Sequence, residues 1–450
     1  MRRRALIAGL MAGAAAVGAT GIAVTARSDH SPARRSAAAP AAVSQGPSPL
    51  LAPLGAGGAQ PTAAGLAHAL AGLVHDRRLG PRVGYSIADA LTGHRLAGVQ
   101  DARPATPASV TKLATAAAVL TRPGAGVRLV TRVMAGASAG DVVLVGGGDP
   151  TLSVGARQAY AGGPRLDRLA AAVRRVVHGP IRRLLVDTSA YAGPTTATGW
   201  DTDLVGSGNV APITALMIDG GRLDPARRAR SSTPDLAAGR AFARLLGVPA
   251  GEVARGRASA HAAELARVTS RPVGDLVEQM LTLSDNVLAE ALARRVAVAG
   301  GEPASFAGAV AAISATLDRT GAPTAGLRLY DGSGLSRRDL LPAGLLTSLL
   351  AKAAGGTALR PILTGLPVAG YSGTLADRFH TARSRPGAGD IRAKTGTLSG
   401  VSALAGVVRD ASGRLLAFAV LADRVPAGGT AGAEAALDAA ATTLSRCGCR

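Results

Sequence analysis

Three apolar runs follow one another at residues 390–423, DIRAKTGTLSGVSALAGVVRDASGRLLAFAVLAD, with a tight turn at Ala411–Gly413. Strands joined this closely pair antiparallel, because a parallel pair needs a crossover of a dozen or more residues. The chain is therefore expected to carry an antiparallel sheet near its C-terminal end. A helical pattern at 430–445 is expected to close the chain.

Helical patterns also cover 273–301, 303–319 and 340–354. Near the start, residues 62–76 predict a helix, and residues 82–98 predict two strands around a turn at Thr92 and Gly93. Together these elements predict an α+β fold in which helices flank an antiparallel sheet.

A β-rich segment interrupts this pattern. Two strands are expected within 128–152, a helix at 165–177 and another strand at 181–189. The segment is long enough to fold as a unit of its own. We therefore expect a discontinuous domain, 61–125 and 265–450, with a smaller inserted domain, 126–264, which we call the insertion.

The N-terminus has the pattern of an export signal. Arg2, Arg3 and Arg4 precede residues 5–26, which carry no charge. Residues 1–26 are expected to act as a cleaved signal peptide or to remain as an N-terminal membrane anchor. Residues 27–60, rich in Ala, Pro, Ser and Gly, are expected to form a flexible linker. The protein is thus predicted to work outside the cytoplasm, either secreted or tethered.

The net charge of +21 suits an anionic partner. The arginines of the chain are scattered and have no aromatic residues interleaved with them. We therefore expect no nucleic-acid binding and at most weak association with an anionic cell envelope. The seven histidines form no pair at metal-ligand spacing, and neither a metal nor another cofactor is expected. Cys447 and Cys449 allow a local disulfide or two free thiols.

Lysine is rare in this chain. Of the 50 basic residues only Lys112, Lys352 and Lys394 are lysines, and all others are arginines. An ammonium can lose its proton near neutral pH when it is buried, which a guanidinium cannot do, so a retained lysine hints at proton-transfer chemistry. Lys352 belongs to no motif and is expected to be a solvated helix residue.

Lys112 follows Ser109 by three residues at the start of a predicted helix, so both side chains lie on one face. A buried, neutral lysine can activate a serine hydroxyl as a nucleophile. A serine at a helix start is more commonly only an N-cap, so this pattern alone is weak.

Two further polar motifs accompany this pair. Ser284, Asp285 and Asn286 interrupt an otherwise good helix, which would expose a hydroxyl and an amide to a cleft. Lys394, Thr395 and Gly396 lie on a predicted strand, where the glycine would let a substrate backbone approach closely.

The motifs SVTK, SDN and KTG, in this order, resemble the penicillin-binding protein and serine β-lactamase superfamily. Five flanking stretches narrow the resemblance: GGGDPTL, VDTSAYAGPTTATGW, YDGSGLSRRDLL, LPVAGYSGTLADRF and AKTGTLSGVSALAG. They are similar to the D-alanyl-D-alanine carboxypeptidase/endopeptidase family of class C low-molecular-weight penicillin-binding proteins, over about residues 62–445. That family usually carries two extra domains between the first two motifs, whereas the interval here has room for one.

The resemblance implies a penicillin-binding, transpeptidase-like fold and a serine peptidase. Its substrates would be peptidoglycan stem peptides that end in D-Ala-D-Ala, and cross-linked peptides if the acceptor site accepts them. β-Lactams would inhibit it by forming a slowly hydrolysed acyl-enzyme. Two alternatives stay open, a serine β-lactamase and a non-catalytic cell-wall-binding protein of the same fold.

The resemblance also implies the residue roles. Ser109 would be the nucleophile, with Lys112 as its base. Ser284 would relay the proton to the leaving nitrogen, and Asn286 would hold the substrate amide and the lysine. The KTG strand would bind the terminal carboxylate through Lys394, Thr395 and Thr397, with Gly396 between them. The backbone N–H groups of Ser109 and Thr397 would form the oxyanion hole.

Two other patterns fail their structural context. GASAG at 136–140 matches the nucleophile elbow of hydrolases, but it joins two strands and is expected to be a hairpin loop. GSGNVA at 206–211 mimics a dinucleotide-binding loop, yet Pro212 follows it directly and no βαβ unit surrounds it.

Overall fold

The computed structural model of the chain describes residues 58–450. The expected export signal, and all but the last three residues of the expected linker, lie outside these described residues. Within residues 58–450, no helix is long and apolar enough to cross a membrane.

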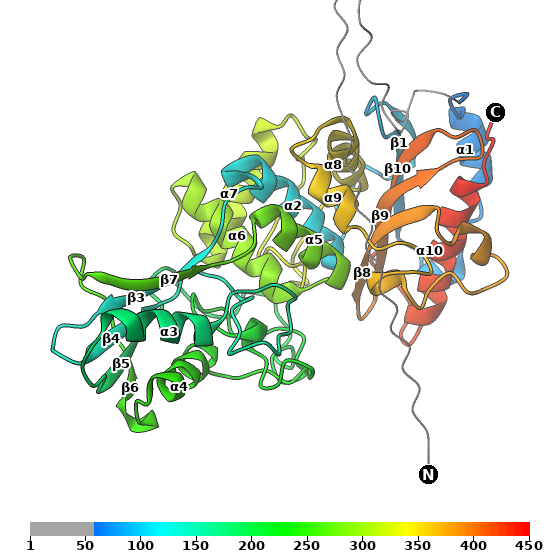
Figure 1. The fold of residues 1–450 in the computed structure, drawn as a ribbon. Helices are drawn as coiled ribbons and strands as arrows, with labels where there is room; N and C mark the ends of the chain where they lie inside the picture. The colour runs from blue at the N-terminus through cyan, green and yellow to red at the C-terminus, as the bar shows by residue number, and fades with distance from the viewer. Residues whose placement is uncertain (1–57) are drawn as a thin grey trace, which may run out of the picture. The chain divides into compact units, whose positions relative to one another are not determined.

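The first sheet is antiparallel and has the strand order β2-β1-β10-β9-β8 (Figure 1). Its C-terminal strands are β8 (Ile391–Leu398), β9 (Val401–Arg409) and β10 (Leu415–Ala422), and they form the consecutive antiparallel pairs that the sequence predicted. The predicted hairpin is β1 (Val83–Asp89) and β2 (Arg95–Val99). β1 pairs with β10, which brings the two ends of the described chain into one sheet.

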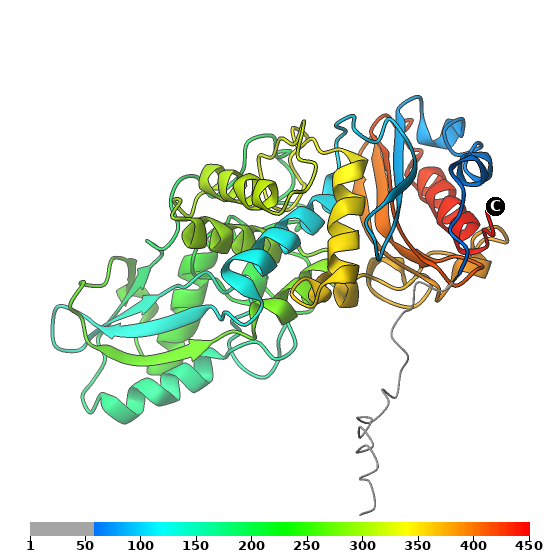
Figure 2. The same ribbon diagram turned by 90° about the horizontal axis from the view of Figure 1, so that it is seen from above.

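Both faces of this sheet are buried, which explains why the inner strands β9 and β10 are almost entirely apolar. In β10, Leu416, Phe418 and Val420 belong to one core cluster, and Ala417 and Ala419 belong to another. α10 (Thr430–Ser445) and α1 (Ala63–Ala69) pack on the first side, and α8 (Ala343–Gly355) on the second (Figure 2). The period-2 alternation of a strand places neighbouring residues in different cores.

A layer of helices continues from the α8 side. It contains α2 (Lys112–Val119), α5 (Val273–Leu283), α6 (Asn286–Gly300), α7 (Phe306–Arg319) and α9 (Arg360–Gly365). Every residue of α2 is buried, and four of its eight residues are alanines. Small side chains let α5, α6, α7 and α8 all approach this central helix.

The insertion forms a second, mixed sheet in the order β6-β5-β4-β3-β7. Its strands are β3 (Val130–Ala135), β4 (Asp141–Val145), β5 (Arg183–Asp187), β6 (Val253–Arg255) and β7 (Glu264–Thr269), and its helices are α3 (Leu166–Val176) and α4 (Pro234–Leu246). β4 and β5 are parallel, because α3 forms the crossover between them. The boundary expected after residue 264 falls within β7, which pairs with β3 as part of the second sheet.

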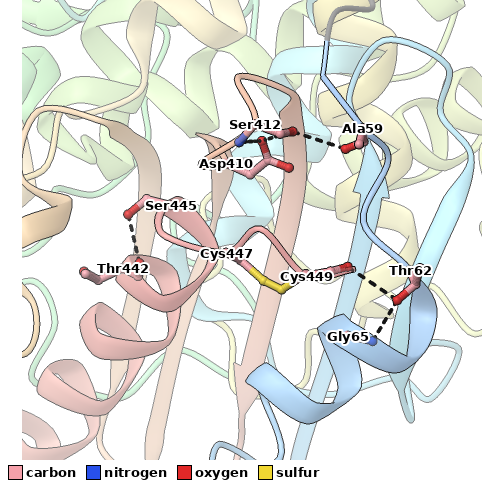
Figure 3. Close-up of a disulfide and its surroundings, with 9 residues drawn as sticks. All are labelled: Ala59, Thr62, Gly65, Asp410, Ser412, Thr442, Ser445, Cys447 and Cys449. Atoms are coloured by element: carbon pink, nitrogen blue, oxygen red, sulfur yellow. Dashed lines mark hydrogen bonds between the residues drawn. A yellow bond between two sulfur atoms is a disulfide. The ribbon is translucent and has the colours of Figure 1, made fainter.

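The C-terminal cysteines form a disulfide, one of the two states that the sequence allowed (Figure 3). The carbonyl oxygen of Cys449 accepts a hydrogen bond from the backbone N–H of Thr62 at 2.8 Å. Thr62 is the N-cap of α1, and its hydroxyl oxygen accepts from the Gly65 N–H at 3.0 Å. The cross-linked C-terminus therefore anchors the first helix beside the first sheet.

Candidate active site

Ser109 lies in a short 3₁₀ helix, η2 (Ala108–Thr111), that leads directly into α2. The residue before it, Ala108, has a φ of 49°, a left-handed conformation that is costly for a residue with a Cβ. Ser109 is half-buried at the mouth of a cavity, whereas Lys112, one turn further on, is completely buried. The expected Ser109–Lys112 pair is therefore formed.

Lys112 Nζ has three oxygen neighbours. They are Ser109 Oγ at 2.9 Å, Asn286 Oδ1 at 2.7 Å and the carbonyl oxygen of Ser333 at 2.7 Å. Burial lowers the pKa of Lys112 to about 8, although the carboxylates of Asp331 and Asp285 oppose this shift. A substantial fraction of this lysine is thus neutral in mildly alkaline solution.

The SDN motif breaks the helical pattern, as the sequence predicted. α5 ends at Leu283, and Ser284 adopts a left-handed conformation with a φ of 53°. Asp285 is the N-cap of α6, and its Oδ1 accepts a hydrogen bond from the Leu288 N–H at 2.9 Å. This sharp turn lets Asn286 reach Lys112 and Ser284 reach Lys394.

Asn286 connects Lys112 to the insertion. Its Nδ2 donates to the carbonyl oxygen of Asn209 at 2.9 Å, which leaves Oδ1 for the lysine. Asn209 lies in the GSGNVA stretch, in the connection between β5 and α4 of a parallel β5-α4-β6 unit, so the expectation that no βαβ unit surrounds this stretch is wrong. The stretch does not open a helix, because α4 begins only at Pro234. That its backbone supports the second motif was not predicted from the sequence.

Lys394, on β8, is also completely buried. Its Nζ donates to Ser284 Oγ at 2.8 Å and to the Thr395 carbonyl oxygen at 2.7 Å. Burial, reinforced by the positive charge of Lys112, holds the pKa of Lys394 well below its usual range. The three motifs predicted from sequence are therefore joined by hydrogen bonds that run from Ser109 to Lys112 and Asn286, and from Lys394 to Ser284.

Gly396 has a packing role that the sequence did not predict, and its expected role in the approach of a substrate backbone stays a prediction. A Cβ at this position would lie 2.6 Å from the carbonyl oxygen of Pro107 and 3.3 Å from Val110 Cγ1. The space beside the glycine is thus occupied by the element that carries Ser109. Gly396 lets β8 pack closely against η2, which sets the distance between the first and third motifs.

The hydroxyls of the KTG strand have protein partners. Thr395 Oγ1 is hydrogen-bonded to Thr374 Oγ1 at 2.8 Å, and Thr397 Oγ1 donates to Glu434 Oε1 at 3.0 Å. Arg378 forms a bidentate ion pair with Asp438, with a shortest distance of 2.6 Å.

These groups surround a cavity of about 450 Å³. It is lined by Ser109, Ser284, Thr374, Asp377, Arg378, Thr395, Thr397 and Glu434. Four of these residues, Thr374, Asp377, Arg378 and Glu434, received no role from the sequence. The first three belong to the LPVAGYSGTLADRF stretch that supported the family resemblance, which was the available signal.

The remaining sequence predictions have simple outcomes. GASAG lies in the loop between the antiparallel strands β3 and β4, as predicted. Lys352 is half-buried on α8 and lines none of the cavity around Ser109. Among residues 58–450, no three His, Cys, Asp or Glu side chains are grouped as ligands for a metal ion.

Comparison with solved structures supports the predicted fold class. Penicillin binding protein 4 (dacB) of Haemophilus influenzae aligns with a TM-score of 0.69 and 21% identity, over 82% of this chain and 97% of that protein. A complex of the same protein with a β-lactam aligns with a TM-score of 0.62 over the same shares. The predicted α+β, penicillin-binding fold is therefore confirmed.

Sequence comparison gives closer relatives. Carboxypeptidase Rv3627c of Mycobacterium tuberculosis is 45% identical over 401 residues, 87% of this chain and 86% of the relative. Carboxypeptidase DacB of Mycolicibacterium smegmatis is 44% identical over 402 residues, 86% of this chain and 85% of the relative. The family model described as the D-Ala-D-Ala carboxypeptidase 3 (S13) family matches residues 66–229 and 226–444. This chain belongs to the D-Ala-D-Ala carboxypeptidase 3 (S13) family, as its three polar motifs predicted.

Proposed function

We propose that the protein is a serine D-alanyl-D-alanine carboxypeptidase that acts on peptidoglycan stem peptides through an acyl-enzyme on Ser109. The arrangement around Lys112 supports this most strongly. Two of its three neighbours, Asn286 Oδ1 and the Ser333 carbonyl oxygen, can only accept hydrogen bonds. A neutral lysine has two N–H donors and one lone pair, so both donors are used and the lone pair faces the Ser109 hydroxyl.

In the acylation step, Ser109 Oγ attacks the carbonyl carbon of the D-Ala-D-Ala peptide bond while its proton passes to Lys112 Nζ. The backbone N–H groups of Ser109 and Thr397 stabilise the oxyanion. The C–N bond then breaks, and the proton held by Lys112 passes through Ser284, whose hydroxyl is held by Lys394, to the leaving nitrogen, which leaves Lys112 neutral again. Terminal D-Ala departs as a free amine, and an ester remains on Ser109.

In the second step, water attacks this ester, releases the shortened peptide as a carboxylic acid and restores the Ser109 hydroxyl. Lys394, Thr395 and Thr397 would bind the carboxylate of the terminal residue. The same steps would cleave a cross-linked peptide whose acceptor residue fits the leaving-group side, which gives endopeptidase activity. β-Lactams would acylate Ser109, and the resulting acyl-enzyme would be hydrolysed slowly.

The location and partners of the protein are part of this proposal. The charge-free run at residues 5–26 behind three arginines supports export, with the mature protein either released or tethered outside the cytoplasm. The net charge of +21 supports weak attraction to an anionic envelope. Peptidoglycan, which lies in that compartment, is then the accessible substrate.

The test is release of D-Ala from a stem pentapeptide by the wild-type protein and by Ser109→Ala. Wild type is expected to release D-Ala, and the variant is expected to lose at least about 10³-fold of the rate, because no other group can form the ester. Hydrolysis that persists in Ser109→Ala, or a wild type that binds the peptide without cleaving it, would contradict the proposal. The second outcome would favour a non-catalytic wall-binding protein.

A further inference from the structure

The carboxylate of Asp331 is completely buried and accepts four N–H donors. Its Oδ1 accepts from the backbone of Ser333 at 3.0 Å and of Gly334 at 2.6 Å. Its Oδ2 accepts from the backbone of Ser336 at 2.7 Å and from Trp200 Nε1 at 2.7 Å. Three donors come from the 331–336 loop itself, and the fourth comes from the insertion. Asp331 therefore fixes the shape of the loop and ties it to another part of the chain.

This loop lies directly behind the reactive pair. Its Ser333 carbonyl oxygen accepts from Lys112 Nζ at 2.7 Å. Gly334 packs so closely that a Cβ there would lie 2.0 Å from the carbonyl oxygen of Ala108, the neighbour of Ser109. The loop therefore contacts both the lysine and the element that carries the serine, and a displacement of the loop would disturb their geometry.

The insertion holds the loop by more than one bond. Ser336 Oγ donates to the carbonyl oxygen of Thr198 at 2.9 Å, and the Arg337 N–H donates to that of Gly199 at 3.2 Å. Trp200 adds a third hydrogen bond between the insertion and this part of the chain, through its Nε1 to Asp331 Oδ2. Trp200 is the single tryptophan of the chain, and its indole packs edge-on against Phe306 with ring centroids 5.5 Å apart. The 198–200 segment and the 331–336 loop thus form one hydrogen-bonded unit.

We propose that Trp200 and Asp331 are positioning residues, through which the insertion holds the Ser333 carbonyl oxygen against Lys112 and so keeps the lysine lone pair on Ser109. Neither residue lines the cavity around Ser109, so they act through the loop. This inference rests on the proposed function, because it assumes that Lys112 takes the proton of Ser109. It gives the insertion a role in catalysis, whereas the sequence predicted only a separate folded unit.

Two substitutions separate the hydrogen bond from the charge. Trp200→Phe removes one N–H donor and retains the carboxylate and an aromatic ring. Asp331→Asn removes a negative charge that favours the protonated form of Lys112. Because the neutral lysine then persists to lower pH, the acid limb of the acylation rate should move to lower pH in Asp331→Asn. The charged groups that face Lys112 are Asp285, Glu290, Asp331, Asp339 and Lys394.

A matched control exists within the insertion. Arg255 Nε donates to the buried carboxylate of Asp235 at 2.6 Å, so Arg255→Gln also weakens an N–H to carboxylate contact in this segment. Neither residue contacts the 331–336 loop through a side-chain hydrogen bond. If Trp200→Phe lowered the activity only by destabilising the insertion as a whole, Arg255→Gln should lower the activity as well.

The experiment measures the rate constant for acylation by a fluorescent penicillin as a function of pH, in the wild-type full chain and in Ser109→Ala, Trp200→Phe, Asp331→Asn and Arg255→Gln. We expect Trp200→Phe to lose about tenfold in the limiting rate, since small displacements of catalytic groups cost this much or more. Asp331→Asn should lose more than tenfold in the limiting rate, and the fall of its acylation rate at low pH should occur at a lower pH than in the wild type. Arg255→Gln should match the wild type, and Ser109→Ala should not react.

Thermal melting of each variant shows whether it is folded. A folded Trp200→Phe that is acylated at the wild-type rate, or a loss that Arg255→Gln shares, would overturn the inference while leaving the proposed function intact. This holds even if Asp331→Asn does not fold, because Trp200→Phe retains the carboxylate and the ring. A wild type that is not acylated at all would overturn the proposed function, and this inference with it.

Discussion

Glu434 Oε1 accepts a hydrogen bond from Thr397 Oγ1 at 3.0 Å, and both residues line the same cavity as Ser109. Thr397 is one of the residues proposed to bind the terminal carboxylate of the substrate. The Glu434 carboxylate therefore takes the Thr397 hydroxyl that the substrate carboxylate would need as a hydrogen-bond donor, and the two carboxylates would repel each other. Arg378 lies 3.8 Å from Glu434 Oε1 and offsets the repulsion between the two carboxylates only in part, because its shorter ion pair, at 2.6 Å, is with Asp438.

Glu434→Gln is therefore expected to raise kcat/KM for a peptide ending in D-Ala-D-Ala. Two unit charges about 4 Å apart in a water-like medium repel by about 1 kcal/mol, which corresponds to about fivefold. The glutamine retains an oxygen that can accept from Thr397. Release of D-Ala measures the effect, and Glu434→Asp, which retains the charge, is the control. An equal gain for a peptide with an amidated C-terminus would show that charge repulsion is not the cause.

The acylation rate is expected to fall at low pH because Lys112 must be neutral to accept a proton. Its pKa is lowered by burial to about 8, so the neutral fraction falls about tenfold for each pH unit below that value. The rate of penicillin labelling between pH 6 and 9 measures this limb. A labelling rate that does not change across this range would contradict the requirement for a neutral Lys112. Lys112→Met, which cannot accept the proton, should abolish labelling at every pH.

Ser284→Gly tests the proton relay without adding backbone strain. Ser284 has a φ of 53°, a conformation that glycine adopts readily, so the substitution should leave stability within about 1 kcal/mol. Loss of the hydroxyl removes a partner of Lys394 and should lower D-Ala release by 10²- to 10⁴-fold, the usual range for a general acid or base. Unchanged turnover in a folded Ser284→Gly would assign the proton transfer to another group.

Gly396→Ala should be destabilising, because the added methyl group would meet the Pro107 carbonyl oxygen at 2.6 Å. Overpacking of this kind costs about 1–3 kcal/mol and should push β8 away from η2. The melting temperature and the rate of penicillin labelling should both decrease. Gly72→Ala is the matched control, since a Cβ there meets no atom within 4 Å. Equal melting temperatures for the two variants would show that the close packing at Gly396 is not required.

Much of this molecule could be predicted because its signals are local. The apolar alternation and tight turn at 390–423 predict the antiparallel strands, and the poor helix formers Ser284–Asn286 predict the break between α5 and α6. The rarity of lysine also distinguishes Lys112 and Lys394 from the many arginines, and both are completely buried. Each of these inferences needs only residues that are neighbours in sequence.

The rest depends on contacts between distant segments. Glu434 is 37 residues from Thr397, and Trp200 is 131 residues from Asp331. Packing of α10 on the first sheet creates the first contact, and docking of the 198–200 segment on the 331–336 loop creates the second. Neither follows from local propensity. β6 was missed for a related reason, because its three residues are held by parallel pairing with β5 and have little pattern of their own.

The central claim, that Ser109 is the nucleophile, is tested most directly by the intact mass of the protein after incubation with a penicillin. The account predicts one added penicillin on the wild type, mapped to the peptide that contains Ser109, and none on Ser109→Ala. An adduct on Ser109→Ala, or unmodified wild type with the penicillin unchanged, would contradict the account. Penicillin consumed without an adduct would instead identify the protein as a β-lactamase.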